Sequence, residues 1–306
     1  MAGPNRGSEL SSQAAMQTDP DRIAANAGGH ADVLVLGATG RVGEALRRLL
    51  PGYGLSVRGV PRTGWTGQTD LATWIEAVDP RVIVYAAAIA DPDRCEQDPS
   101  ASYEVNVAGA GWVADAAAKA GRRVIYYSSD YVFGAPGRYF EDAPTAPLQV
   151  YGRHKVAAEQ LLLSRGDNVV IRLPLLFGSR DFIAEAVAAM LNGTPLSMDD
   201  RRRYPIPVEH VVRVTSSVVA TKFGIGIYHA VGVDGVTKAA WAGYIAELLD
   251  RPVPPALAPA GRPVAPRPVD VELATHHPEM RTQPGTLWAA TQARVAELCG
   301  AGGGAN

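Results

Sequence analysis

Three residues that could take part in proton transfer recur at four-residue intervals in VYGRHKVAAEQ, residues 150–160. Tyr151, Lys155 and Glu159 would lie along one face of a helix, because residues four apart are neighbours on a helical surface. A tyrosine has a pKa of about 10, and an ammonium beside it favours the phenolate and would lower that pKa toward neutrality. Tyr151 is therefore a candidate general acid. The alternative is a surface helix with an incidental tyrosine, on which Lys155 pairs with Glu159.

A hydroxyl group is expected close to this pair. The apolar run RRVIYYSS (122–129) is followed by DYVFG, so Ser129 would end a strand one helix before Tyr151. Ligands of doubly wound sheets bind at the carboxyl ends of the strands. Hydride that reaches a carbonyl carbon leaves an alkoxide, which Tyr151 could protonate while Ser129 holds the oxygen by a hydrogen bond. These residues together indicate reduction of a carbonyl group.

The segment DVLVLGATGRVGEALRRLL (32–50) predicts a dinucleotide-binding turn. Gly37, Gly40 and Gly43 follow an apolar strand directly and lie across the start of a helix. Such a turn lets backbone N–H groups and the helix N-terminus face a pyrophosphate. Glycines alone are weak evidence, but the order of strand, turn and helix is the context that supports a dinucleotide site.

The residues around the end of the second expected strand favour NADP over NAD. An NAD site usually carries an acid about 20 residues after the glycines, for the ribose hydroxyls. This chain reads SVRGVPRTG (56–64), with Arg58 and Arg62 and no carboxylate. Arginine can pair with a 2′-phosphate, so NADP is preferred and NAD is possible; the alternative is that both arginines are solvated. Asp70 could contact the adenine, act as the N-cap of the next helix, or do both.

The elements that must position these residues alternate along the chain after residue 30. The expected strands are 32–38, 55–60, 81–87, 122–129, 168–174 and 225–231, and the expected helices lie near 41–50, 70–78, 100–120, 149–164, 181–192, 208–221, 237–249 and 286–298. The strand runs are apolar throughout, as expected when helices cover both faces of a parallel sheet. The alternation predicts an α/β fold, a doubly wound parallel sheet of the Rossmann type with a smaller C-terminal substrate-binding portion.

The chain divides into three expected regions. Residues 1–30 are small and polar and are expected to form a flexible N-terminal extension. Residues 31–175 would form the NADP-binding Rossmann domain, to which the helix near 208–221 and the strand near 225–231 return, and 176–306 would be mainly substrate-binding. The Pro-rich segment 251–268 is expected to be an extended surface loop, because proline is excluded from helix interiors and central strands.

Composition argues against several classes of protein. The formal net charge of −2 gives no footprint for nucleic acid or an anionic membrane. No apolar run approaches the roughly 20 residues of a membrane span. Cys95 and Cys299 are too few for a disulfide framework, so a cytoplasmic protein is expected. His276 and His277 are adjacent, a poor spacing for chelation, and no Cys/His cluster occurs, so no metal is predicted.

Taken together, the motifs resemble those of the extended short-chain dehydrogenases/reductases. GATGRVG, the asparagine in EVNVAGA, SSDYVFG and YGRHK occur in the family's order over roughly residues 31–235. The chain is most similar to the dTDP-4-dehydrorhamnose reductase type, NADPH-dependent reductases of nucleotide-linked 4-keto-6-deoxysugars. The segment AAAIADPDRCEQDPSASYEVN and the S-[ST]-D-Y-V-F strand end carry this closer resemblance.

The resemblance implies a role for each matching residue. The catalytic residues would be Ser129, Tyr151 as the acid, Lys155, and Asn106 as support for the active-site helix and a proton-relay water. The cofactor would contact Gly37, Thr39, Gly40, Arg41, Val42, Gly43, Arg58, Arg62, Asp70, Leu71, Ala87 and Lys155. The substrate would contact Ser129, Asp130, Tyr131 and Arg172. Three alternatives stay open: an ordinary polar role for Asn106, an ion pair for Arg172, and either a diphosphate grip or a solvated charge cluster for Arg201, Arg202 and Arg203.

One departure from the family bears on the reaction. Family dehydratases carry Thr-Asp-Glu after this strand, whereas this chain has Ser129, Asp130 and Tyr131, so dehydration is disfavoured. The resemblance therefore implies a reductase of a nucleotide-activated keto-sugar, with a homodimer as a family-level expectation. A non-sugar ketone is not excluded. Two other functions stay open: a nucleotide-sugar 4-epimerase with bound NAD, and a non-catalytic regulatory subunit such as that of methionine adenosyltransferase.

Overall fold

The computed structural model describes residues 28–178, 181–220, 223–257 and 264–300. Its centre is a sheet of six parallel strands in the order β10-β6-β4-β3-β1-β2. These strands are β1 (Val33–Leu36), β2 (Val57–Val60), β3 (Val82–Tyr85), β4 (Arg123–Ser129), β6 (Val169–Leu173) and β10 (Gly226–His229). The six expected strands and the doubly wound α/β fold are confirmed.

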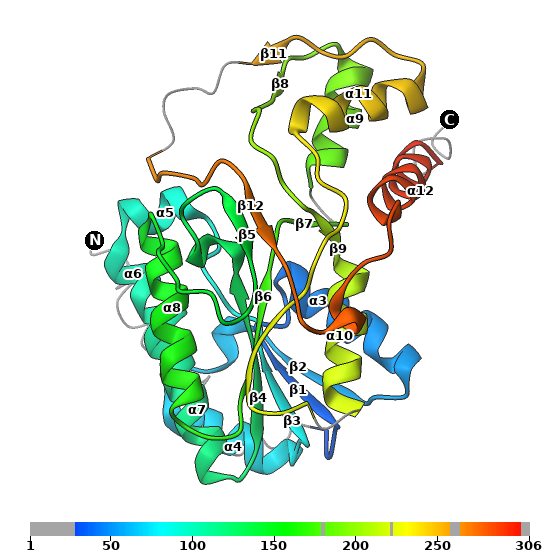
Figure 1. The fold of residues 1–306 in the computed structure, drawn as a ribbon. Coiled ribbons are helices and arrows are strands. Elements are labelled where there is room, and N and C mark those ends of the chain that lie inside the picture. The colour runs from blue at the N-terminus through cyan, green and yellow to red at the C-terminus, as the bar shows by residue number, and fades with distance from the viewer. Residues whose placement is uncertain (1–27, 179–180, 221–222, 258–263, 301–306) are drawn as a thin grey trace, which may run out of the picture.

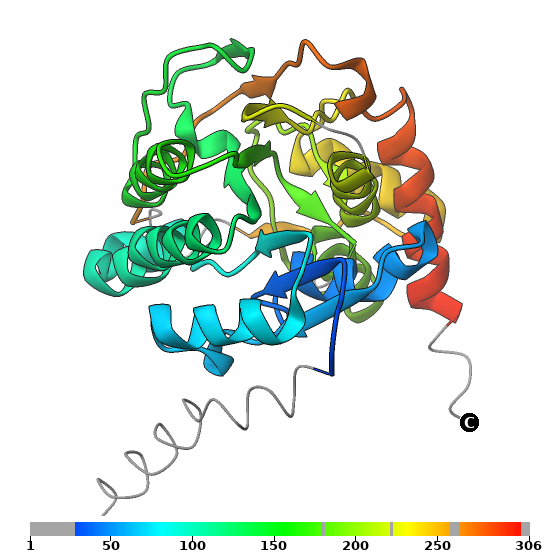
Figure 2. The same cartoon turned by 90° about the horizontal axis from the view of Figure 1, so that it is seen from below.

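Helices cover both faces of this sheet (Figures 1 and 2). The helices α4 (Gln68–Val78), α7 (Gly109–Lys119) and α8 (Val150–Leu163) lie on one face, and α3 (Arg41–Leu49) and α10 (Val208–Ala220) lie on the other. Successive strand residues alternate between the two faces: Tyr126 packs with the first set of helices and Tyr127 with the second. Because both faces are buried, the strands are apolar at nearly every position.

The order of the strands changes direction between β1 and β3, because β2 lies on one side of β1 and all later strands lie on the other. At the carboxyl ends of these two strands, the turn after β1 packs on the segment after β3. Gly37 has a φ of +93°, and a Cβ at this position would lie 2.5 Å from the Ala87 nitrogen. Only glycine meets both conditions. Doubly wound sheets bind their ligands in the crevice at such a switch point.

A smaller C-terminal portion has its own apolar cluster beyond the carboxyl ends of the strands (Figure 1). It contains α9 (Phe182–Asn192), α11 (Lys238–Leu249) and α12 (Thr286–Gly300), with Trp241 in ring contact with Phe177 and Phe182. The short strands β8 (Leu196–Ser197) and β11 (Ala256–Leu257) pair beside these helices. Strand β10 lies at the edge of the main sheet and α10 packs against that sheet.

Several short elements were not anticipated. They are α5 (Pro92–Gln97), the paired strands β5 (Gly137–Tyr139) and β12 (Val271–Leu273), the paired strands β7 (Leu176–Phe177) and β9 (Ile206–Pro207), and 3₁₀ turns at Leu50–Tyr53, Arg62–Gly64, Asp130–Val132 and Pro278–Met280. The helix expected over 100–120 is divided into α6 (Pro99–Tyr103), a π-helical turn (Glu104–Ala108) and α7. Nearly all of the N-terminal extension lies outside the described residues. Within the described ranges, no helix has the length and apolar character needed to cross a bilayer.

Candidate active site

A cavity of about 540 Å³ lies at the carboxyl ends of the strands, beside the switch point. Its walls come from the start of α3, the segments after β3 and β6, the end of β4, the first turns of α8, and two arginines from the C-terminal half of the chain. The structure therefore brings catalytic and cofactor candidates from distant segments to one place. The predicted site residues in its lining are Gly40, Arg41, Val42, Ala87, Ser129, Asp130, Tyr131, Tyr151 and Lys155.

Ser129 and Asp130 form a hydrogen-bonded pair at the end of β4. The Ser129 hydroxyl donates to Asp130 Oδ1 at 2.9 Å and accepts from the Tyr131 N–H at 3.2 Å. The Asp130 side chain is buried, and this burial raises its pKa to about 6. The bond from Ser129 and the charge of Arg203 act in the opposite direction. Asp130 is thus a cavity-lining carboxyl group with a raised pKa, bonded to the Ser129 hydroxyl.

We expect the Asp130→Asn substitution to stabilise the protein more at high pH than at low pH. The folded-state pKa lies above the unfolded one, so the folded state binds the extra proton, and the free energy of unfolding falls as pH rises from about 4 to about 6. That loss would be on the order of 2–3 kcal/mol above this window. Asparagine does not ionise, so the variant does not lose this unfolding free energy as the pH rises. Urea unfolding of both proteins at about pH 4 and about pH 8 measures the difference; an equal effect at both pH values would contradict it.

Helix α8 carries Tyr151 and Lys155 into the cavity from its first two turns. The helix starts at Val150, whose N–H donates to Glu96 Oε2 at 2.9 Å. Lys155 Nζ donates to the Tyr127 carbonyl at 2.8 Å and lies 5.6 Å from the centroid of the Tyr151 ring. Burial lowers the pKa of Lys155 to about 8. The predicted face of Tyr151 and Lys155 is therefore present, as a buried face and not a surface one.

The expected lowering of the Tyr151 pKa is wrong for this structure. Tyr151 is only 8% exposed, and burial raises its pKa because the phenolate loses hydration. The Asp130 carboxylate raises it further, and a hydrogen bond with Ser129 only partly opposes this. The ammonium of Lys155 is directed at the Tyr127 carbonyl. Tyr151 is therefore held as the neutral phenol, which is the form that can donate a proton.

Glu159, the third residue of the face, does not pair with Lys155. Its carboxylate is buried and accepts two hydrogen bonds from Arg172, from Nε at 3.0 Å and from Nη2 at 2.8 Å. Arg172 Nη1 lies 3.3 Å from His229 Nε2, so the guanidinium joins α8 to β6 and β10. Arg172 is absent from the cavity lining. Of the two roles left open for Arg172, the structure shows the ion pair and does not bring the residue to the predicted substrate site.

Asn106 and Asp70 are also held by local hydrogen bonds. Asn106 lies in the π-helical turn, accepts from the Ile89 N–H at 2.9 Å and donates to the Ile89 carbonyl at 3.0 Å. It therefore fixes the segment after β3, which forms one wall of the cavity. The N-cap of α4 is Gly67 and not Asp70. The Asp70 carboxylate instead accepts hydrogen bonds from the Thr66 N–H at 2.7 Å and from the Thr66 hydroxyl at 2.9 Å. Leu71, beside it, is fully buried in the core.

The three glycines have different surroundings. Gly40 is the N-cap of α3, lines the cavity, and leaves the helix N-terminus without a side-chain cap. A Cβ on Gly43 would lie 2.3 Å from the Gly37 carbonyl oxygen, so these two glycines let the turn pack tightly and do not line the cavity. Thr39 is exposed beside them, and Arg41 Nη1 donates to the Leu176 carbonyl at 2.9 Å.

The two arginines predicted to select NADP lie outside the cavity lining. Arg62 lies over the Trp65 ring at 4.3 Å and donates from Nη1 to the Trp65 carbonyl at 2.9 Å. The guanidinium of Arg58 lies against the backbone at Gly28. Arg62 is therefore not simply solvated, since it is stacked and hydrogen-bonded.

Two arginines of the cavity wall come from the C-terminal half of the chain, and only Arg203 was among the sequence candidates. Arg203 lines the cavity and donates from Nη1 to the carbonyls of Arg202 and Val269, at 2.8 and 3.3 Å. Its place in the wall is compatible with the diphosphate contact, one of the two alternatives left open for it. Arg267, from the Pro-rich segment, also lines the cavity and forms a two-pronged ion pair with Asp93 at 2.8 and 3.0 Å. Residues 258–263 of the predicted surface loop lie outside the described residues, and most of the others in the segment are exposed. The contact of Arg267 with α5, over 170 positions away, gives no local signal in the sequence.

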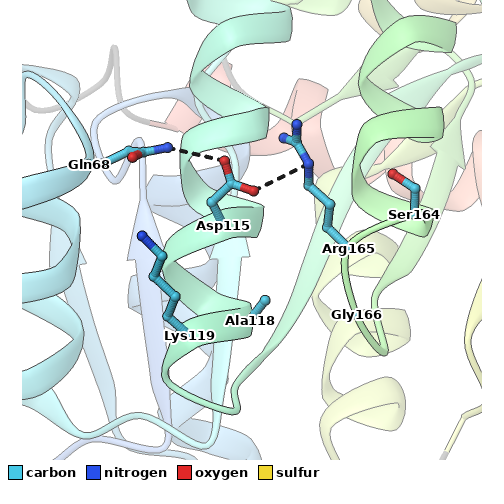
Figure 3. A pocket seen from close by; sticks show the side chains of 7 residues that line it. All are labelled: Gln68, Asp115, Ala118, Lys119, Ser164, Arg165 and Gly166. Atoms are coloured by element: carbon cyan, nitrogen blue, oxygen red, sulfur yellow. Dashed lines mark hydrogen bonds and ion pairs between the residues drawn. The ribbon is translucent and has the colours of Figure 1, made fainter.

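A second hollow of about 490 Å³ contains none of the predicted site residues. It lies between α4, α7 and the end of α8, where Asp115 accepts a hydrogen bond from Gln68 and pairs with Arg165 (Figure 3). Across the described ranges, no group of three or more His, Cys, Asp and Glu side chains is placed to hold a metal ion.

Comparison with known proteins gives concordant results. The family model of the RmlD substrate binding domain matches residues 31–298. The chain is 33% identical over 223 residues to dTDP-4-dehydrorhamnose reductase of Streptomyces griseus, covering 68% of this chain and 73% of that protein. It is 32% identical over 243 residues to methionine adenosyltransferase 2 subunit beta of Pongo abelii, covering 72% of each. The structure of dTDP-4-dehydrorhamnose reductase from Bacillus anthracis in complex with NADP aligns with a TM-score of 0.75 at 21% identity, over 87% of this chain and 97% of that one.

Proposed function

Because the chain belongs to the RmlD-like family of extended short-chain dehydrogenases/reductases, we propose that it catalyses NADPH-dependent reduction of a keto group on a nucleotide-activated 4-keto-6-deoxy sugar. One observation carries the proposal. Ser129, Tyr151 and Lys155 line the same cavity as the uncapped start of α3. A proton donor, an oxygen-binding hydroxyl and a dinucleotide cradle are the parts that a carbonyl reductase needs.

The residues of the turn after β1 fit a dinucleotide. The N-terminus of α3 carries a partial positive charge and has no side-chain cap, which suits a pyrophosphate. Gly40 leaves room there, since a Cβ on it would meet only the Gly37 carbonyl oxygen, at 3.5 Å. Lys155 would bind the nicotinamide ribose. The lack of a carboxylate over residues 56–64 supports NADP as the preferred cofactor, with NAD as a possible one. Arg58 and Arg62 would have to leave their contacts at Gly28 and Trp65 to pair with a 2′-phosphate.

Three side chains would stabilise and protonate the keto oxygen during reduction. Bound NADPH would supply the hydride to the keto carbon. Ser129 would turn its hydroxyl from Asp130 to the keto oxygen and stabilise the charge that develops there. Tyr151, held as a neutral phenol by its burial, would donate its proton to that oxygen. Lys155, buried one helical turn further on, would then stabilise the resulting phenolate.

Arg203 supports an anionic substrate. Its hydrogen-bond partners are backbone carbonyls, and no carboxylate is hydrogen-bonded to it among the described residues, although its charge lowers the pKa of Asp130 and of Asp199. Arg267 differs, because Asp93 already balances its charge. Arginine binds phosphate oxygens well. We propose that Arg203 contacts the diphosphate of the nucleotide sugar.

The test mixes the purified protein with NADPH, and separately with NADH, and a panel of dTDP- and UDP-linked 4-keto-6-deoxy sugars. Loss of cofactor absorbance that depends on the sugar, in equal amount to the product formed, would support a reductase and identify its substrate. Equimolar consumption of NADPH would exclude a 4-epimerase, which returns its hydride. Tight NADPH binding without oxidation by any sugar would contradict the sugar-reductase proposal.

A regulatory subunit is the second candidate, and the similarity to methionine adenosyltransferase 2 subunit beta favours it. In that case a binding partner would be stabilised by the chain with or without the Tyr151 hydroxyl. Co-purification with a stable partner, unaffected by Tyr151→Phe, would support this function. The cytoplasmic location, the homodimer and the substrate-binding role of the C-terminal portion stay predictions.

A further inference from the structure

Ser128 is a buried polar residue with an unpaired hydroxyl in the wall of the cavity. It is 4% exposed, and its Oγ has no hydrogen-bond partner among the described residues. The hydroxyls on either side along β4 are paired: that of Tyr127 with Thr215 at 2.6 Å, and that of Ser129 with Asp130 at 2.9 Å. Most buried hydroxyls in proteins are hydrogen-bonded, so the exception calls for a physical reason.

The side chain paired with Ser128 in the sheet register does not supply a hydrogen bond to its hydroxyl. Ser128 lies opposite Arg172 in the β4–β6 pairing. Three of the Arg172 nitrogens are already engaged, Nε and Nη2 by Glu159 and Nη1 by His229. The guanidinium is thus held in the interior, and Ser128 remains a residue of the cavity lining whose buried Oγ bonds no other polar group of the described residues.

Ser128 lies between the dinucleotide cradle and the catalytic residues. Strands β3 and β4 are neighbours, with Tyr85 opposite Tyr126, so the segment 86–88 after β3 runs beside the end of β4. Gly37 packs on Ala87 of this segment, at the start of the cradle. A dinucleotide whose pyrophosphate lies at the start of α3, and whose reactive ring lies beside Tyr151, must pass the end of β4.

We propose that the Ser128 hydroxyl hydrogen-bonds the nicotinamide-nucleotide end of the bound dinucleotide, through a carboxamide or ribose oxygen or nitrogen. This role rests on the proposed function, because it requires that the cavity binds a dinucleotide. It makes Ser128 a cofactor-binding residue in addition to the cradle and Lys155.

The proposal predicts that Ser128→Ala weakens cofactor binding without lowering stability. The variant should bind NADPH about 3- to 10-fold more weakly in a fluorescence titration, as expected for one lost neutral hydrogen bond. The ligand-free variant should melt at the wild-type temperature, because Ser128 Oγ makes no hydrogen bond with another described residue. Ser216→Ala is the matched control: Ser216 is buried in α10, and its Oγ donates to the Arg213 carbonyl at 2.8 Å. Its affinity for NADPH should equal that of the wild type.

Three results would overturn the proposal. Unchanged NADPH affinity of Ser128→Ala would show that the hydroxyl does not contact the cofactor. Weaker binding together with a lower melting temperature of the free variant would show a structural role instead. Unchanged NADPH affinity with a raised KM for the keto-sugar would move the contact to the substrate. If the wild type itself binds neither NADPH nor NADH, the proposed function fails first, and the two failures are thereby distinguished.

Discussion

Replacement of Tyr151 by phenylalanine should lower kcat for keto-sugar reduction by about 100-fold or more, the size of the contribution expected from a positioned general acid. The reason is local. Tyr151 is a buried phenol in the cavity wall, its pKa is raised, and its hydroxyl reaches Ser129. Phenylalanine keeps the ring contact with Tyr131, whose centroid lies 6.1 Å away, and removes only the proton that the alkoxide needs.

The measurement is steady-state NADPH oxidation with the sugar found in the panel assay, together with NADPH titration of each variant. Tyr151→Phe should retain NADPH affinity within a few-fold, which separates a chemical defect from misfolding. Tyr228→Phe is the control, since Tyr228 is a buried tyrosine outside the cavity whose hydroxyl donates to the Gly224 carbonyl at 3.2 Å. It should keep wild-type kcat. A Tyr151→Phe enzyme with normal turnover would show that another group donates the proton.

The sequence was sufficient for the fold because its signals are local. Apolar runs of strand length, separated by helical patterns, specify a parallel sheet covered on both faces, and the glycine turn marks its first crossing. Tyr151, Lys155 and Ser129 were found for the same reason: each lies in a short motif at a position that the topology fixes. The fold itself then brings these residues into one cavity at the carboxyl ends of the strands.

Residues whose roles depend on distant contacts could not be predicted. Arg267 lies in the cavity wall and pairs with Asp93, which is 174 positions away in the chain. Arg203 could be proposed as a diphosphate contact, but its place in the wall depends on the pairing of its segment with Val236. Burial was misjudged for a related reason. The Lys155 ammonium was expected to lower the Tyr151 pKa, but burial is the largest influence on both groups, so the pKa of Tyr151 rises and that of Lys155 falls. Spacing along a helix says nothing about how much water remains around it.

Glu159 is a further residue whose burial the helical spacing did not reveal, and its replacement should have the second large effect, on stability. Glu159→Gln should lower the free energy of unfolding by about 3–5 kcal/mol, because it leaves the Arg172 guanidinium buried without its counter-charge. Both side chains are almost fully buried, at 2% and 4% side-chain exposure for Arg172 and Glu159. Urea unfolding gives the change. Arg165→Met is the control: Arg165 pairs with Asp115 at 3.2 Å, but both are about one-third exposed, so at most about 1 kcal/mol should be lost.

The Glu159–Arg172 pair also bears on catalysis, because Glu159 lies one helical turn beyond Lys155 and its charge raises the Lys155 pKa, which burial lowers. Removing that charge should lower the Lys155 pKa below its value of about 8. The alkaline limb of kcat/KM for Glu159→Gln should therefore move to lower pH, if Lys155 must be protonated to bind cofactor and stabilise the phenolate. The double variant Glu159→Gln/Arg172→Met should regain part of the lost stability, since no unpaired charge is left, but it should keep the shifted pH profile. A pH profile that recovers with stability would assign the pair a structural role alone.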